Sequence, residues 1–370
     1  MAQEIVIAGA GVAGLTAAIS LHRAGRAVRV VDRGAASGAH RFPDWDAIEN
    51  WTSAEDVPAF LARIGIDPDR FRHTGRSTFS VIDPYGRRHD VRTPRPFFYL
   101  IKRGAVAGGL EHGLQAQAEA AGIPIAYHSV CPPAQADIWA GGTFGQGSRF
   151  ISAGFTFRTD HPDWICGLID MTIAPRAYAY LAIVEGEGTL AVLLTEARHE
   201  ANALLERAVA AFRRHTALDI RDRHRAGGSG GDLAAFWHGR RDFVIGEAGG
   251  YQDFLWGFGI RYALLSGYLA AQAVLTGRDW QALADAELRP LVRASLVNRW
   301  LYDRMPAAGF AALIRHFTRS PDLNALTGRW YHPRRFHHLL WPVAARHFTR
   351  QTATLAGHTR YVNRTRSGKS

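Results

Sequence analysis

The stretch Glu4–Arg33 constrains the fold most, because it contains every part of a dinucleotide-binding βαβ unit in the correct order. A short apolar run leads into Gly9, Gly11 and Gly14, which have the spacing G-x-G-x-x-G. In this pattern the first glycine permits a tight turn, the second lets the backbone approach a pyrophosphate, and the third lets a helix pack close to the strand. The expected helix begins around Val12 and Ala13, so that its N-terminal amides face the phosphates.

The same stretch ends in an acid that we expect to bind an adenosine ribose. A second apolar strand, residues 27–31, leads directly into Asp32 and Arg33. An acid roughly 20 positions after the glycines accepts hydrogen bonds from a ribose 2′-hydroxyl and repels a 2′-phosphate. The predicted ligand is therefore FAD or NAD, and NADP is excluded.

Composition indicates a globular enzyme from a reducing compartment. The 370 residues are 47% hydrophobic, which is ordinary for a chain that forms two intertwined domains. Cys131 and Cys166 are the only cysteines, too few for a disulfide framework or a CxxC metal site, and we expect no metal. No window of about 18 consecutive apolar residues suggests a membrane span. We expect a cytoplasmic protein.

The net charge of +11 is concentrated at the C-terminal end. Residues 289–370 contain 15 Lys and Arg against only Asp303 and Asp322, interleaved with aromatic side chains. Such a region suits anionic lipid, an acidic partner or an anionic substrate, or it is simply a solvated helical surface. Nucleic acid is the least favoured partner. Peripheral attachment to a membrane is thus an alternative to a freely cytoplasmic protein.

A second glycine motif identifies the cofactor. Val244–Gly277 has a strand, a glycine-rich loop and a long amphipathic helix that begins near Gly259. Together with the N-terminal fingerprint, it resembles the FAD-dependent oxidoreductases with the para-hydroxybenzoate hydroxylase type of fold, most closely their geranylgeranyl reductase branch. That resemblance implies that Gly246 and Glu247 lie at the ribityl and pyrophosphate side of FAD, with glutamate in place of the family's aspartate. It also implies that backbone amides face the flavin pyrimidine edge at Gly257, Gly259 and Ile260.

Other segments are similar to the family at positions that contact the cofactor or the substrate. The resemblance implies further cofactor contacts at Arg103 after a strand and at Val130 beside the adenine. Arg41 is a further cofactor-binding candidate because it lies in a Gly/Ala-rich loop that we expect to wrap around the ligand. No catalytic acid or base stands out, and the candidates, all close to matching motifs, are Tyr178, Tyr180, Tyr251 and Trp256. The family's middle acid–glycine motif is replaced by Phe144-Gly145, with Ser148-Arg149 downstream, which departs from standard hydroxylases.

The predicted fold class is α/β, with a Rossmann-type FAD-binding domain interleaved with an antiparallel-sheet substrate domain. We assign residues 1–45, 95–150 and 235–280 to the first domain, 46–94 and 151–234 to the second, and 281–370 to a basic helical C-terminal region. The run GGSGG at 227–231 is typical of a flexible linker, or of a loop that comes close to a ligand.

The leading functional hypothesis is a reductase in which reduced flavin passes a hydride to a double bond of a hydrophobic small molecule, isoprenoid-like or a secondary metabolite. The alternatives are a flavin-dependent monooxygenase, either a hydroxylase or a halogenase, and an oxidase or dehydrogenase of a small organic substrate. A non-catalytic nucleotide-binding protein is a further alternative. Because the chain has no second nucleotide fingerprint, NAD(P)H would visit the flavin only transiently as electron donor.

Overall fold

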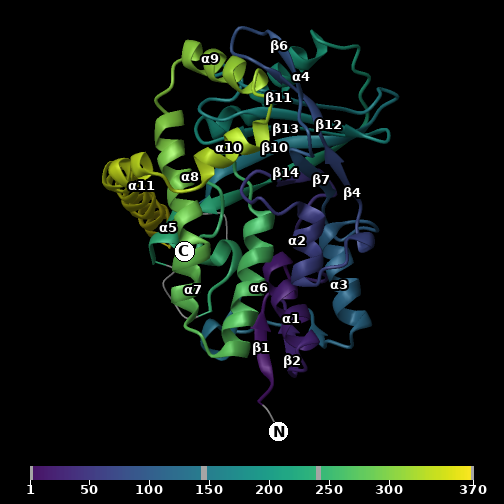
Figure 1. Ribbon diagram of the computed structural model, residues 1–370, viewed down its shortest axis with the longest axis vertical. Coiled ribbons are helices and arrows are strands. Elements are labelled where there is room, and N and C mark those ends of the chain that lie inside the picture. Colours follow the sequence, from purple (N-terminus) through teal and green to yellow (C-terminus); the bar gives the residue numbers. More distant parts are fainter. Residues whose placement is uncertain (1–2, 143–147, 239–242, 368–370) are drawn as a thin grey trace.

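The computed structural model describes residues 3–142, 148–238 and 243–367. Phe144 and Gly145, which replace the family's middle motif, lie outside these residues. Within the described chain, three sheets and a set of C-terminal helices form the body of the protein (Figure 1).

A four-stranded parallel sheet contains the N-terminal motif. Its strands, in spatial order, are β8 (Ile125–Ala126), β2 (Val28–Val31), β1 (Ile5–Ala8) and β9 (Ile138–Trp139). Val244 extends the sheet by an isolated parallel bridge to Trp139. The helix α1 (Val12–Arg23) connects β1 to β2, and it packs between α3 (Leu110–Ala120) and α6 (Ile260–Thr276). The predicted Rossmann-type unit is confirmed, including its second helix more than two hundred residues later.

A seven-stranded sheet, antiparallel apart from the β11–β5 pair, occupies the other half of the molecule (Figure 1). Its strands, in spatial order, are β14 (Arg221–Asp232), β10 (Ser148–Arg158), β13 (Glu187–Leu194), β12 (Ala179–Val184), β11 (Trp164–Leu168), β5 (Thr78–Ile82) and β6 (Arg88–Arg92). The helix α4 (Ala201–Arg213), which follows the short η3 (Arg198–Glu200), packs on this sheet through β13 and β10. The predicted antiparallel sheet is confirmed.

The linker expectation for 227–231 is wrong, because these glycines belong to β14. They pair in antiparallel register with Phe150–Ala153 of β10. At Gly227, where φ is +129°, a Cβ would lie 2.1 Å from the backbone oxygen of Ser152. The absence of a side chain at Gly227 therefore serves close strand packing, not chain flexibility.

A small antiparallel sheet stands between the two larger ones. Its strands are β3 (Trp45–Glu49), β7 (Phe98–Lys102) and β4 (His73–Arg76), in that order. The adjoining helical turns are α2 (Val57–Ile64) and η1 (Pro68–Arg70), and η2 (Pro133–Gln135) precedes β9. The side chains of β7 are all buried, so this sheet is part of the core.

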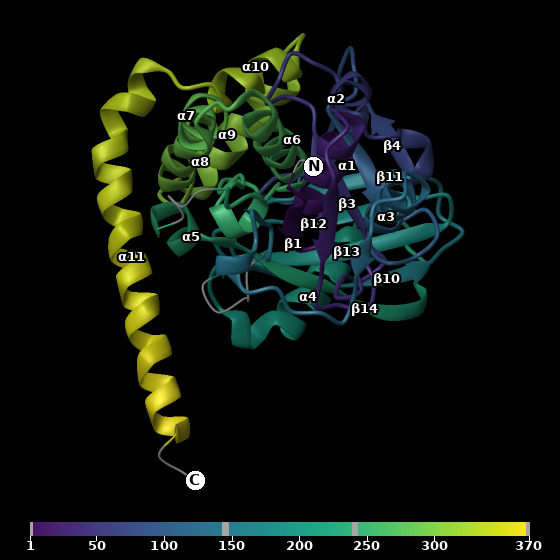
Figure 2. The ribbon, with the colours of Figure 1, turned by 90° about the horizontal axis from the view of Figure 1, so that it is seen from below.

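The C-terminal helices belong to the body of the protein. They are α7 (Trp280–Glu287), α8 (Arg289–Tyr302), α9 (Ala307–Thr318), α10 (Leu323–Tyr331) and α11 (Arg335–Ser367), preceded by α5 (Leu233–His238) and η4 (Gly246–Gly249). The first half of α11 packs on α8 and α5, with Ala344 and Phe348 in the core. Trp280 and Leu296 share one hydrophobic cluster with β1 and α1, whereas Phe310 and Tyr331 share another with Trp45. Figure 2 shows α11 as a long helix along one side, with its C-terminal end beyond the rest of the molecule in that view.

Candidate functional site

The three glycines of the N-terminal motif have three different environments. Gly9 has φ of +107°, and a Cβ there would lie 2.3 Å from the backbone oxygen of Ala140. A Cβ on Gly14 would lie 1.9 Å from the oxygen of Gly9, so helix and strand could not keep this spacing. A Cβ on Gly11 would meet nothing within 4 Å. The chain's own packing requires the first and third glycines, whereas the second borders open space at the start of α1, as a pyrophosphate site would.

Asp32 is held at the end of β2 by two backbone amides. Its carboxylate accepts hydrogen bonds from the N–H of Ala10 and of Gly34, each at 2.6 Å. Arg33 and Val130 line the cavity beside it, and Val130 is 81% exposed, so this end opens to solvent. The arrangement suits a ribose and an adenine, and the contact between Asp32 and the ribose stays a prediction.

The helix α6 directs a second free N-terminus at the same region. Its N-cap residue Gly259 makes no side-chain cap, and neither does Gly11 at the start of α1. The two helices pack closely, since a Cβ on Gly267 would lie 2.3 Å from the backbone oxygen of Ala13. Amides at a helix N-terminus attract negative charge. Two such termini therefore suit a ligand with one anionic group at each, such as the pyrophosphate and the reduced pyrimidine edge of FAD.

One cavity of about 1140 Å³ connects the predicted residues. Those that line it are Gly9, Gly11, Val12, Ala13, Asp32, Arg33, Arg41, Arg103, Val130, Tyr178, Tyr180, Gly246, Glu247, Tyr251, Trp256, Gly257, Gly259 and Ile260. Gly14 lies beneath, at the contact between α1 and β1. Small-molecule pockets usually measure about 300–1,000 Å³. This cavity therefore has room for an extended dinucleotide and a second ligand, and its lining fits FAD.

Glu247 contacts the antiparallel sheet. Its Oε1 accepts a hydrogen bond from the N–H of Gly231 in β14, at 2.9 Å. The longer glutamate side chain thus links η4 to β14 at the cavity wall, and its contact with a ribityl chain stays a prediction.

The two predicted arginines converge on one carboxylate. Arg41 and Arg103 each place a guanidinium nitrogen 2.6 Å from the same oxygen of Asp46. Arg103, only 7% exposed, also binds Glu111 through its Nε and a terminal nitrogen. Burial acts to raise the pKa of Glu111, but the charge and hydrogen bonds of Arg103 lower it to about 2. Arg103 is thus anchored at the cavity wall by two acids, and its contact with the flavin stays a prediction.

The cavity continues past Gly257 into an apolar chamber. Its wall consists of aromatic and aliphatic side chains from segments far apart in the sequence. They include Phe79, Phe97, Ile165, Phe310, Ile314 and Phe317. The Tyr178 hydroxyl donates to the backbone oxygen of Trp256 at 2.8 Å. Tyr251 is buried and packs edge-on against Trp280, so it is mainly a core residue. Tyr180 is half-buried at the chamber wall.

Sequence reasoning missed two sets of cavity residues. One is the apolar face of α9, which has the spacing i, i+4, i+7 at Phe310, Ile314 and Phe317 and which that periodicity alone could have revealed. The other is Asp44 with Asp46, two acids that flank Trp45 at the start of β3. Burial and the charge of Asp46 raise the pKa of Asp44 to about 7, although Arg41 and Arg103 act against this.

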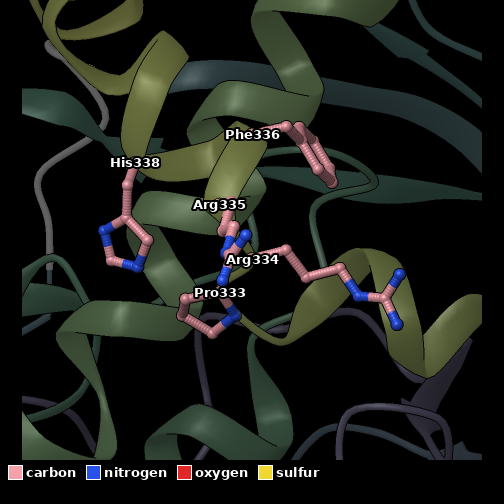
Figure 3. A pocket seen from close by; sticks show the side chains of 5 residues that line it. All are labelled: Pro333, Arg334, Arg335, Phe336 and His338. Atoms are coloured by element: carbon pink, nitrogen blue, oxygen red, sulfur yellow. The ribbon is translucent and has the colours of Figure 1, made fainter.

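A second, open pocket of about 700 Å³ lies at the start of α11 (Figure 3). Its lining is Pro333, Arg334, Arg335, Phe336 and His338. No residue of either glycine motif contributes to it. It is therefore separate from the candidate flavin site.

Comparisons with known proteins agree with this geometry. Residues 4–42 match the FAD binding domain family, and no curated protein sequence matches the chain significantly. Among solved structures, a geranylgeranyl bacteriochlorophyll reductase-like protein from Thermoplasma acidophilum has a TM-score of 0.68 at 14% identity, over 91% of this chain and 98% of that one. A flavoprotein/dehydrogenase from Cytophaga hutchinsonii has a TM-score of 0.61 at 13% identity, over 96% of this chain and 100% of that one. A 2-methyl-3-hydroxypyridine-5-carboxylic acid oxygenase (Y270A mutant) has a TM-score of 0.52 at 17% identity, over 89% of this chain and 96% of that one.

Residues 4–42 thus match an FAD-binding domain, and the chain has the fold of the FAD-dependent oxidoreductases. The prediction of the fold is confirmed, and the family match supports FAD as the cofactor. The similar structures carry reductase, dehydrogenase and oxygenase names, so the fold alone leaves the reaction open. In the part of the chain that the structure describes, no helix is both long and apolar enough to cross a bilayer.

Proposed function

We propose that this FAD-dependent oxidoreductase reduces a carbon–carbon double bond of a hydrophobic, isoprenoid-like or secondary-metabolite substrate. The observation that carries the proposal is the apolar chamber beside the N-terminus of α6. Residues such as Phe79, Phe97 and Phe310 form its wall, and they would exclude water from a bound hydrocarbon chain. Hydride transfer depends mainly on how the two reactants are positioned, and a chamber continuous with the cofactor cavity provides that.

When bound, FAD supplies the hydride. The chain's own part is to hold the cofactor through Asp32 and the N-termini of α1 and α6, and to orient the substrate against its reactive edge. The bond from Tyr178 to Trp256 fixes the loop that leads into Gly257. NAD(P)H, without a domain of its own in this chain, is the proposed transient electron donor.

The test begins with the absorption spectrum of the purified protein, reconstituted with FAD. The flavin is then reduced anaerobically with dithionite and mixed with geranylgeraniol as the alkene probe. We expect flavin reoxidation with a mass gain of two hydrogens per reduced double bond, and no reoxidation with the fully saturated alcohol as control. A protein that cannot be reconstituted with FAD would contradict the proposal. Hydroxylated or halogenated product formed only in air would instead support the monooxygenase alternative.

A second observation favours attachment to an anionic lipid surface through α11. After Asp322 the sequence has no acidic residue, although it has nine Lys and Arg. On α11, Leu339 is 77% exposed and Val343 52% exposed, and they lie on the same side as exposed Arg335 and Arg346. Exposed apolar residues flanked by arginines are typical of helices that lie at a membrane surface. We propose that the enzyme is cytoplasmic and peripheral to the membrane.

Sedimentation with vesicles tests this attachment. We expect binding to phosphatidylcholine vesicles containing phosphatidylglycerol but not to pure phosphatidylcholine. Each arginine near an anionic surface contributes about 1 kcal/mol, so Arg335→Glu with Arg346→Glu should weaken binding by well over tenfold. The matched control, Arg87→Glu with Arg92→Glu, makes the same charge change on exposed positions around β6. Equal loss in both double variants would refute a specific role for α11.

A further inference from the structure

Asp44 occupies an unusual position at the wall of the cavity. The residue is 5% exposed, and its Oδ1 is buried with no hydrogen-bond partner among the residues that the structure describes. Its backbone is fixed on both sides, because its N–H donates to the oxygen of Phe42 and its oxygen accepts from the N–H of Arg103. A buried carboxylate oxygen without a hydrogen bond costs free energy unless the group carries a proton or meets a ligand. The position of Asp44 therefore suggests a function.

The neighbouring Asp46 explains which of the two acids holds a proton. Two guanidinium groups bind Asp46, from Arg41 and Arg103, each at 2.6 Å. Two nearby carboxylates resist ionising together, so the charge of Asp46 favours the protonated form of Asp44, which has no salt bridge of its own among the described residues. Burial and the charge of Asp46 together raise the pKa of Asp44 to about 7.

Other titratable groups at this part of the cavity are poor proton donors near neutral pH. Burial, followed by the charges of Asp46 and Asp44, raises the pKa of Tyr180 well above its ordinary value. The hydroxyl of Tyr178 is already bonded to Trp256. Burial and the charge of Arg41 lower the pKa of His40, which leaves its imidazole neutral. Of these groups at the cavity wall, Asp44 is the one whose pKa, about 7, matches the pH at which an enzyme operates.

We propose that Asp44 is the proton donor of the reduction. Its carboxyl O–H would give a proton to one carbon of the substrate double bond, and the other carbon would receive the hydride that bound, reduced FAD would supply. The π bond breaks, two C–H bonds form, the flavin is oxidised by two electrons, and the Asp44 carboxylate regains its proton from water. This assignment rests on the proposed function, because it requires an alkene in the chamber.

The first test compares Asp44→Asn, Asp44→Glu and the control Asp160→Asn in single turnovers of dithionite-reduced, FAD-loaded protein with geranylgeraniol. Asp160 is a surface acid with 84% side-chain exposure. General acid catalysis typically contributes about 10²–10⁴-fold, so we expect a loss of that size in Asp44→Asn and partial recovery in Asp44→Glu. In the wild type the rate should fall above about pH 7, and this pH dependence should be absent from Asp44→Asn. Asp160→Asn should behave as the wild type.

The second test does not need turnover. The infrared difference between wild type and Asp44→Asn should contain the band of a protonated carboxylic acid that titrates near pH 7. Other buried acids, such as Glu49 and Asp253, cancel in this difference. An Asp44→Asn variant that keeps the wild-type rate and pH profile, or a difference spectrum without the band, would overturn the assignment alone. A wild type that binds FAD but reduces no alkene would overturn the proposed function, and the donor role with it.

Discussion

Replacing Glu49 by glutamine should make the protein more stable at alkaline pH. Glu49 ends β3 and is fully buried. Its Oε1 accepts a 3.3 Å hydrogen bond from Thr52, whereas Oε2 has no partner among the described residues. Burial raises its pKa from the ordinary 4.5 to about 7, although the charge of Arg261 acts against this. Glutamine keeps the shape of the side chain and removes the charge.

The sign follows from the direction of the pKa change. Below pH 4.5 the carboxyl is protonated in both the folded and the unfolded chain and causes no pH-dependent loss. As the pH rises from 4.5 towards 7, the unfolded chain ionises first, so the folded state loses stability, and above 7 the loss is complete. The difference between the two pKa values corresponds to about 3 kcal/mol. As the pH is raised from about 5 to about 8.5, the free energy of unfolding of Glu49→Gln should therefore increase by about 2–3 kcal/mol relative to that of the wild type.

Urea titrations with saturating FAD measure the free energies of unfolding of the wild type and of Glu49→Gln at both pH values. The predicted gain is the amount by which the difference between the two proteins changes from the lower pH to the higher. Comparing differences cancels the other titrating groups. Glu55→Gln serves as a control of opposite sign, because the hydrogen bond from Arg63 lowers the pKa of Glu55, and this variant should be less stable at pH 8.5. A difference between Glu49→Gln and wild type that is the same at both pH values would refute the reasoning.

Two further predictions concern the glycine loop and a buried ion network. Gly11→Ala should change the stability of the FAD-free protein by less than about 0.5 kcal/mol but weaken FAD binding, whereas Gly14→Ala, whose Cβ would collide with backbone, should cost at least about 2 kcal/mol; thermal melts and fluorescence titration with FAD separate the two effects. Asp303→Asn removes the charge that pairs with buried Arg299 and Arg149, and should cost about 3–5 kcal/mol in urea titrations. A loss below about 1 kcal/mol would show that water solvates these arginines.

Local patterns were sufficient to predict many of the residues that line the cavity at the two glycine motifs. The spacing of Gly9, Gly11 and Gly14, and the loop at Gly257–Ile260, each depend on the backbone of one short segment. Asp44 could not be identified in this way, because its raised pKa depends on Arg41 and Arg103 both forming salt bridges with Asp46 and not with Asp44. The positions of these salt bridges result from the pairing of β3 with β7, which brings Asp46 close to Arg103.

Composition was misleading where pairing across a sheet decides the structure. The run at 227–231 has the residues of a linker, but the partner strand β10 holds it extended. In the same way, the positive charge of residues 289–370 predicted a basic surface but gave no indication that the apolar face of α9 lines the chamber. Charge patterns describe exposed positions, whereas a chamber wall is made by the few residues that face inward.

The position of α9 places part of the chamber wall in a different stretch of the sequence from the cofactor end of the cavity. The residues that line the cofactor end of the cavity all precede residue 264, and α9 adds Phe310, Ile314 and Phe317 only to the chamber. A helix that lines the proposed substrate chamber but follows every cofactor motif can change without altering the predicted FAD contacts. Related chains could therefore acquire new substrates by exchanging one twelve-residue helix, Ala307–Thr318, on an unaltered flavin scaffold.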